Sequence, residues 1–394
     1  MDTKTNAYLI TLTPLRGIAA LLVVIFHCNL MLNPFMPPGY THFVESGWMW
    51  VDFFFVLSGF IMTYVYGKYF KDGTAWGPYK KFIGARFARV YPLHLFTLIW
   101  AIICAIIIVK LSSSLDPFFA DMFNFKTAAS ASLVLIQSLH LFTAAPLNTP
   151  SWSLSTEWWV YTIFPLFVPF FDGIKTKGKI IALLFLVAFF LFIRYYIGPL
   201  SGPFKGTPQI NIVADFGFIR RLAGFLAGML LFEFYKAKTG YSILKRSGSF
   251  VLFFTATLIM MHFGIMDLII ISMFPFILIS AAYNDTTLKK ILDTRPLQRL
   301  GDWSFSIYMV HVPLMMLYWI YLVKKDPTYF SDLMKMVSSK PNYALGVVLC
   351  IVVVAATLVL ASFTYRYVEV PSRNYLNKLF DARHKKIAVE GVKV

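Results

Sequence analysis

The chain has 394 residues, of which 58% are hydrophobic and only 14% carry charge. Soluble domains average about 45–50% apolar and about 25% charged residues, so this composition excludes an ordinary soluble protein. The net charge of +17 does not indicate nucleic-acid binding, because the basic residues collect in short loops between apolar runs. The three cysteines lie inside apolar runs and are expected to pack as small buried groups, which excludes a disulfide scaffold.

The apolar runs, taken in chain order, predict ten membrane-spanning helices of about 20 residues each. They cover about 8–32, 46–66, 91–110, 152–172, 180–198, 215–234, 249–263, 267–284, 303–323 and 343–367. The predicted fold class is all-α, a polytopic transmembrane helical bundle. We expect one transmembrane domain over 1–375 and a short basic cytoplasmic tail over 376–394.

The distribution of positive charge predicts the orientation of these spans. With a cytoplasmic N-terminus, most of the 36 Lys and Arg residues fall on the cytoplasmic side, as the positive-inside rule requires. Both termini are then cytoplasmic, and the protein is expected in the cytoplasmic (inner) membrane. A further apolar stretch, about 128–145, would move the later basic loops outside if it crossed, so it is interpreted as a re-entrant or interfacial segment.

The first span carries Arg16 and His27, and ionisable groups inside a membrane are costly. Their spacing places both on one face of a helix, about 16 Å apart along its axis. Arg16 also argues against a cleaved signal peptide. Snorkelling to the headgroups is the alternative for Arg16, and a hydrogen bond to a neighbouring helix is the alternative for His27. However, His27 lies too deep to snorkel, and imidazole is the side chain that transfers protons near neutral pH.

Two carboxylates are expected at the depth of His27. Asp52 and Glu157 each lie roughly 9 Å below the outer boundary, and His27 lies roughly 10 Å below it. A base with two carboxylates is sufficient for acid–base chemistry on a hydroxyl, with Asp52 or Glu157 holding the imidazole tautomer. The alternative for both acids is capping of a helix N-terminus and pairing with the helix dipole.

Arg86 and Arg89 occupy the predicted cytoplasmic loop before the third span. Three residues apart on a helix, two guanidinium groups would project together in a geometry that suits phosphate. Anchoring to lipid headgroups is the alternative. His311 is interpreted first as a packing histidine of the span at 303–323. Residues near span ends are assigned to lipid or interhelix pairing: Arg220, Arg221, Glu233 and Glu369.

Six segments, in this order along the chain, resemble the acyltransferase 3 family of integral-membrane O-acyltransferases. The first contains the family's pattern of an arginine, ten residues and a histidine, here Arg16 and His27. The segments are 15–27, 51–60, 86–92, 152–157, 301–311 and 369–373. Each is unspecific alone, but the six together cover the chain from about residue 8 to 375.

The resemblance implies an enzyme that takes an acyl group, usually acetyl, from cytoplasmic acyl-CoA and delivers it to a hydroxyl of a glycan or other cell-envelope acceptor. It implies that His27 is the catalytic base with Arg16 as its partner, and that Arg86 and Arg89 contact the CoA phosphates. The expected partners are membrane lipid, acetyl-CoA or another acyl-CoA, and a carbohydrate or lipid-linked acceptor. Nucleic acid and metal ions are not expected. A polytopic transporter or flippase for an envelope precursor is the alternative, because buried charges are also typical of carriers.

Overall fold

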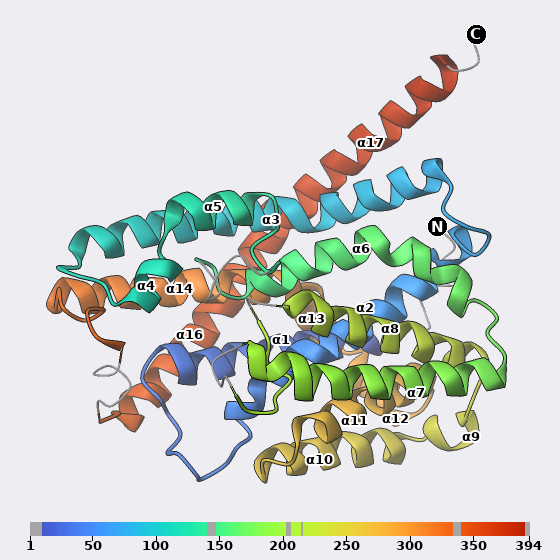
Figure 1. Cartoon of the computed structure of the whole chain (residues 1–394), viewed down its shortest axis with the longest axis horizontal. Coiled ribbons are helices and arrows are strands. Elements are labelled where there is room, and N and C mark those ends of the chain that lie inside the picture. Colours follow the sequence, from blue (N-terminus) through green and yellow to red (C-terminus); the bar gives the residue numbers. More distant parts are fainter. Residues whose placement is uncertain (1–9, 140–146, 202–205, 214–215, 334–339, 391–394) are drawn as a thin grey trace.

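The computed structural model describes residues 10–139, 147–201, 206–213, 216–333 and 340–390 (Figure 1). Within these ranges all regular elements are helices, which confirms the predicted all-α fold. Most of the long helices run side by side in one bundle, and α17 (Val370–Glu390) projects from it toward the C-terminus (Figure 1).

Each of the ten predicted spans corresponds to a long helix. These helices are α1 (Leu12–Met31), α2 (Trp50–Tyr66), α3 (Trp76–Leu111), α6 (Ser151–Phe171), α7 (Thr176–Phe192), α8 (Gly217–Lys236), α10 (Ser247–His262), α11 (Asp267–Tyr283), α14 (Ser304–Lys325) and α16 (Tyr343–Thr364). Six stretches among the described residues, those that contain α1, α2, α3, α7, α14 and α16, are long and apolar enough to cross a membrane. The protein is therefore a multi-pass membrane protein, while the count of ten spans and the cytoplasmic termini stay predictions.

Short helices connect or extend the long ones. They are η1 (Glu45–Met49), η2 (Gly67–Tyr69), α4 (Pro117–Met122), α5 (Phe125–Leu133), η3 (Ile193–Ile197), η4 (Gly198–Leu200), α9 (Tyr241–Leu244), α12 (Thr287–Leu292), α13 (Arg295–Asp302) and η5 (Tyr365–Glu369). α17 follows η5 directly and runs across the predicted boundary between 375 and 376. The Phe380 ring on α17 packs edge-on against Phe87 of α3 at 6.5 Å.

The predicted loop before the third span is wrong, because α3 already begins at Trp76. Pro78 in the first turn is compatible with a helix start, where its missing N–H is not needed. The charged residues that suggested a loop are accommodated on the helix surface, where Lys80 and Lys81 are exposed. At 36 residues, α3 is about 54 Å long, so the arginines at 86 and 89 lie inside a helix.

The stretch 128–145 does not form a single helix. It begins within α5, whose nine residues extend only about 14 Å and are too short to cross a membrane. The chain after α5 packs against the start of α6: Gln137 donates to the Ser151 carbonyl at 3.1 Å, and Ser138 donates to that of Trp152 at 2.9 Å. Residues 140–146 lie outside the described part, so the re-entrant or interfacial assignment stays a prediction.

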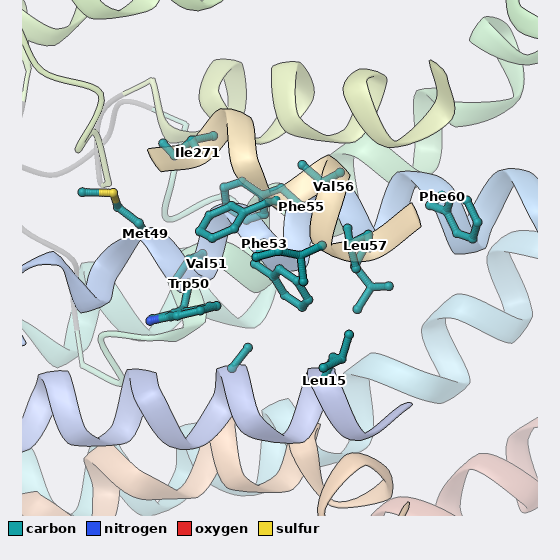
Figure 2. Close-up of a cluster of buried hydrophobic side chains, with 14 of the residues drawn as sticks. Leu15, Met49, Trp50, Val51, Phe53, Phe55, Val56, Leu57, Phe60 and Ile271 are labelled. Carbon is teal, nitrogen blue, oxygen red and sulfur yellow. The ribbon is translucent and has the colours of Figure 1, made fainter. Parts of the chain in front are cut away.

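α2 and α8 cross at a contact between two glycines. A Cβ on Gly228 would overlap the Val56 carbonyl, and a Cβ on Gly59 would overlap that of Phe225. Small residues let membrane helices approach closely, so the glycines bring the two backbones into contact. Figure 2 shows the aromatic side chains of α2 filling the space between α1, which carries Leu15, and Ile271 of α11. This packing fixes α1, α2 and α8 around the site described next.

Candidate active site

A cavity of about 200 Å³ lies among α1, α2, α3, α6, α8 and α14. Its lining carries four arginines and a single carboxylate. The arginines are Arg16, Arg86, Arg89 and Arg221, and the carboxylate is that of Glu157. Hydroxyl groups line the rest of its polar wall: Ser58, Ser153, Tyr161, Ser304 and Tyr308. A positively charged cavity of this kind is suited to an anionic ligand.

Three of the arginines keep an unused donor. The Nε atoms of Arg16, Arg86 and Arg221 are buried and make no hydrogen bond in the described structure. A buried donor without a partner costs about 1–3 kcal/mol, and more when the group is charged. All three side chains line the same cavity, so three incompletely hydrogen-bonded guanidinium groups meet there.

Arg86 is held at the cavity by contacts that leave its charge available. Its Nη2 donates to the Tyr66 hydroxyl at 2.8 Å, and its guanidinium lies 5.0 Å from the centre of the Tyr66 ring. Nη1 lies 3.7 Å from the sulfur of Met62. None of these partners is an acid, so Arg86 brings an unneutralised positive charge to the cavity.

Arg89 differs from Arg86 although both line the cavity. It forms an ion pair with Glu369, whose side chain is 1% exposed. Ser306 donates to the second oxygen of Glu369 at 2.9 Å. Glu369 belongs to η5, a π-helical turn that interrupts the run from α16 to α17, and such turns occur frequently at functional sites. The two guanidinium groups thus project to the same cavity as predicted, although Arg89 is already paired with an acid, and their contact with the CoA phosphates stays a prediction.

Arg16 points into the protein rather than snorkelling. Its Nη2 donates to the Gly301 carbonyl at 3.0 Å. Gly17 makes this contact possible, because a Cβ there would lie only 2.6 Å from the Leu300 carbonyl carbon. Close packing of α1 on α13 thus places the Arg16 guanidinium in the cavity wall.

His27 lies deeper on α1 and is not part of the cavity lining. Its Nδ1 lies 3.0 Å from the Val23 carbonyl and 3.2 Å from Nε2 of His311 on α14. Tyr308, one turn before His311, links this pair to the cavity, since its ring centre is 6.0 Å from that of His311. The Tyr308 hydroxyl also hydrogen-bonds to Ser153 at 2.8 Å.

Asp52 does not contact His27, so the prediction that it holds the imidazole is wrong. It forms a two-point ion pair with Arg220, at 2.9 Å to Nε and 2.6 Å to Nη2. The ring centres of Trp48 and Trp152 lie 4.8 and 5.5 Å from the guanidinium carbon. Of the alternative role, the side-chain cap is absent, but Asp52 does lie in the first turn of α2, where an acid interacts favourably with the helix dipole.

Glu157 lies at the cavity and likewise does not reach His27. It accepts a hydrogen bond from Tyr161 and pairs with Arg221 at 3.1 Å. Tyr161 is in turn within 3.2 Å of the Ser58 hydroxyl, so α2, α6 and α8 meet in one polar network. Glu157 is not a cap either, since α6 begins without a side-chain capping bond.

Comparison with known proteins identifies the family to which this chain belongs. Residues 11–365 match the acyltransferase 3 family, described as an acyltransferase domain. The chain belongs to this family. It is therefore an acyltransferase, and the family assignment predicted from the six segments is confirmed. The same match favours an enzyme over a transporter or flippase.

Two of three similar relatives carry acyltransferase names. "Acyltransferase MdmB" of Streptomyces mycarofaciens is 33% identical over 40% of this chain and 38% of its own length. "O-acetyltransferase OatA" of Staphylococcus aureus is 24% identical over 98% of this chain and 62% of its own length. "Protein 2 in picA locus" of Rhizobium radiobacter is 32% identical over 39% of this chain and 80% of its own length. The chain thus spans less than two thirds of MdmB and of OatA, and no solved structure matches it.

The site of this acyltransferase includes residues that the sequence interpretation assigned elsewhere. Arg221 was expected to pair with lipid or another helix; it does pair with Glu157 of α6, and it also lines the cavity at 2% exposure. Glu369 was given the same role and pairs with Arg89, a residue of the cavity wall. His311 was expected to pack, but it contacts the predicted base. All three are ionisable groups within or next to an apolar span, and that property by itself marks a candidate site residue.

Proposed function

We propose that this enzyme takes an acyl group, in the first place acetyl, from cytoplasmic acyl-CoA and transfers it to a hydroxyl of a glycan or other cell-envelope acceptor. The observation that carries the proposal is the cavity in which Arg16, Arg86 and Arg221 each keep a buried N–H without a partner. In an acyltransferase, the substrate that brings several negative charges is the phosphate-bearing donor.

The phosphates of acyl-CoA match this cavity in charge and in geometry. Guanidinium groups bind phosphate oxygens through paired N–H donors, and such charge-assisted bonds are among the strongest in proteins. A volume of about 200 Å³ is smaller than the roughly 300–1,000 Å³ of a site for a whole drug-sized ligand. The cavity therefore takes one phosphate-bearing part of the donor, and the thioester arm extends past Tyr308 toward the histidines.

His27 is the catalytic base in this proposal. The acceptor oxygen attacks the thioester carbonyl carbon while His27 takes the hydroxyl proton at Nε2. The new C–O bond forms, the C–S bond breaks, and the departing CoA thiolate takes the proton from Nε2. The products are the acyl ester and CoA thiol, and His27 returns to its neutral form.

The acceptor and the location follow from the same proposal. A relative named O-acetyltransferase aligns with 98% of this chain, which supports acetyl as the group and oxygen as the acceptor atom. Most basic residues lie between the spans on one side, which supports cytoplasmic termini and entry of the donor from the cytoplasm, in the inner membrane. The acceptor, a carbohydrate or lipid-linked hydroxyl, then approaches His27 from the opposite side.

Binding of acetyl-CoA to the purified protein in detergent, measured by calorimetry, tests the donor. Arg86→Ala and Arg221→Ala are each expected to raise Kd at least about tenfold, because a hydrogen bond to a charged group contributes about 1.5–3 kcal/mol. Lys80→Ala is the matched control, since Lys80 is an exposed cation on the same helix as Arg86 and lies outside the cavity. Absence of binding by folded wild-type protein, or a Kd in both arginine variants equal to that of wild type, would refute the proposal.

A further inference from the structure

His27 and His311 form a contact between two buried imidazoles from opposite ends of the sequence. His27 is 8% exposed, His311 is fully buried, and their ring centres are 4.9 Å apart. The bond joins Nε2 of His311 to Nδ1 of His27 at 3.2 Å. Only one of two neutral imidazoles can donate in such a bond, so the protons have to be assigned from the remaining partners.

The partner of the other nitrogen fixes the proton on His311. Its Nδ1 lies 3.2 Å from the Ile307 carbonyl, and a carbonyl oxygen only accepts hydrogen bonds. Nδ1 of His311 therefore carries the proton. In the neutral ring Nε2 then carries a lone pair, so it accepts the bond from His27.

The same reasoning fixes the proton on His27. Its Nδ1 faces two acceptors, the Val23 carbonyl and Nε2 of His311, so Nδ1 carries a proton shared between them. Nε2 of neutral His27 consequently carries the lone pair. Among the described residues, Nε2 of His27 makes no hydrogen bond and does not belong to the buried, unpaired polar atoms. The free lone pair is thus on an accessible nitrogen.

We infer that His311 is a positioning residue that holds His27 in the tautomer with a basic Nε2 and stabilises the imidazolium formed during acyl transfer. The inference rests on the proposed function, in which His27 is the base. His311 takes the place that the sequence had given to Asp52 or Glu157, which are bound to Arg220 and Arg221 instead.

The chemistry of the transfer step explains why a hydrogen-bond acceptor is needed next to Nδ1 of His27. When Nε2 of His27 takes the hydroxyl proton, positive charge spreads over the ring, and Nδ1–H becomes a stronger donor. The bond from Nδ1 to Nε2 of His311 then becomes charge-assisted, which roughly doubles its strength. The proton returns from Nε2 of His27 to the CoA thiolate, and His311 keeps its own proton on Nδ1 throughout.

The test compares three histidine variants for kcat, for the KM of acetyl-CoA and for thermal stability. His311→Phe removes the acceptor, and we expect kcat to fall about 100-fold or more, with the KM of acetyl-CoA changed less than about threefold. His311→Gln offers an amide oxygen to Nδ1 of His27 and is expected to recover at least about tenfold of that loss. His94→Phe is the matched control: His94 is equally buried, hydrogen-bonds to the Ser132 carbonyl and lies outside the cavity.

A double variant separates positioning from a general structural effect. In His27→Ala, His311 has no imidazole left to hold, so adding His311→Phe is expected to lower kcat no further. A His311→Phe enzyme with kcat within threefold of wild type would overturn the inference. So would a double variant that is clearly slower than His27→Ala, or a loss in His94→Phe as large as that in His311→Phe.

A spectroscopic measurement tests the inference apart from the proposed function. In protein labelled with 15N at histidine, the signals absent from His27→Ala belong to His27. We expect them to show a protonated Nδ1 in wild type and a mixture of tautomers in His311→Phe. If wild-type protein neither binds nor uses acetyl-CoA, the proposed function fails, yet the spectrum still decides whether His311 fixes the tautomer. Unchanged His27 signals in His311→Phe would refute that role.

Discussion

Asp52→Asn discriminates between a catalytic and a structural role for this carboxylate. The sequence placed Asp52 beside His27, where loss of its charge would slow the reaction and leave the protein stable. In the structure Asp52 pairs with Arg220, and their side chains are 2% and 0% exposed. We therefore expect Asp52→Asn to lower the free energy of unfolding.

The magnitude follows from the contacts of the pair. Breaking a buried ion pair by removing one partner costs about 3–5 kcal/mol, because the other charge stays buried and uncompensated. Asparagine keeps one acceptor for Arg220, so Asp52→Asn belongs near the lower end, about 3 kcal/mol. Asp52→Leu removes both acceptors and belongs near the upper end. The double variant Asp52→Leu/Arg220→Met removes both charges and is expected to lie within about 1 kcal/mol of wild type.

Unfolding of the purified protein in detergent, followed by tryptophan fluorescence, measures these differences, and kcat is measured well below the unfolding temperature. Recovery of stability in the double variant would identify the ion pair as the cause. An Asp52→Asn protein that is as stable as wild type but has lost kcat about 100-fold would refute the structural role. Asp52 would then act on the chemistry after all.

Two further changes test the contacts that build the site. Gly228→Ala is expected to lower the free energy of unfolding by about 1–3 kcal/mol or more, because the added methyl group would push α8 away from α2. Thermal unfolding measures this loss, and an unchanged unfolding midpoint would contradict the close contact. Glu369→Gln keeps one acceptor but removes the charge that pairs with Arg89, and it is expected to lower the free energy of unfolding by about 3 kcal/mol. The control Glu45→Gln breaks a half-exposed pair with His42 and is expected to cost less than about 1 kcal/mol, so equal losses would count against the buried pair.

Helices were predictable from the sequence because membrane spans are long and apolar throughout. The predicted segment 152–172 differs from α6 by one residue at each end, and 267–284 differs from α11 by one residue at its C-terminal end only. The prediction failed at the start of α3, because the helix begins at Trp76, well before the apolar run that was predicted to begin at residue 91. The basic residues from Lys80 to Arg89 precede the apolar run but belong to the same helix, because Lys80 and Lys81 reach solvent from its surface while Arg86 and Arg89 line the cavity. The length of an apolar run therefore indicates which part of a helix can lie in the membrane, but it does not show where the helix begins or ends.

Which ionisable residues meet was much less predictable than which are buried. Depth along a helix follows from counting residues, and it placed Asp52 and His27 in one layer. Which residue a side chain contacts also depends on the direction in which it points from its helix axis. That direction is set by how helices distant in sequence pack against one another. His27 and His311 are separated by 284 residues, and Asp52 and Arg220 by 168. Each side chain had a plausible partner at the same depth, and the crossing of α2 with α8 directs Asp52 to Arg220.

Two adjacent arginines of α8 have different roles because they face different neighbours. Arg220 and Arg221 are about 100° apart around the helix, so they face different neighbours. Arg220 is fully neutralised by Asp52 and fixes α8 against α2. Arg221 faces the cavity, where Glu157 is its partner. The structural ion pair thus orients the helix that presents the second arginine to the cavity.

The balance of charge in the cavity then identifies the sign of its occupant. Glu369 neutralises Arg89 and Glu157 neutralises Arg221, whereas Arg16 and Arg86 have no acidic partner among the described residues. Uncompensated charge inside a membrane protein is costly and is retained where it serves function. An anionic substrate would remove this cost on binding, so part of the binding energy comes from charges that the fold leaves unpaired. The phosphates of an acyl donor meet that requirement, and a neutral acceptor does not.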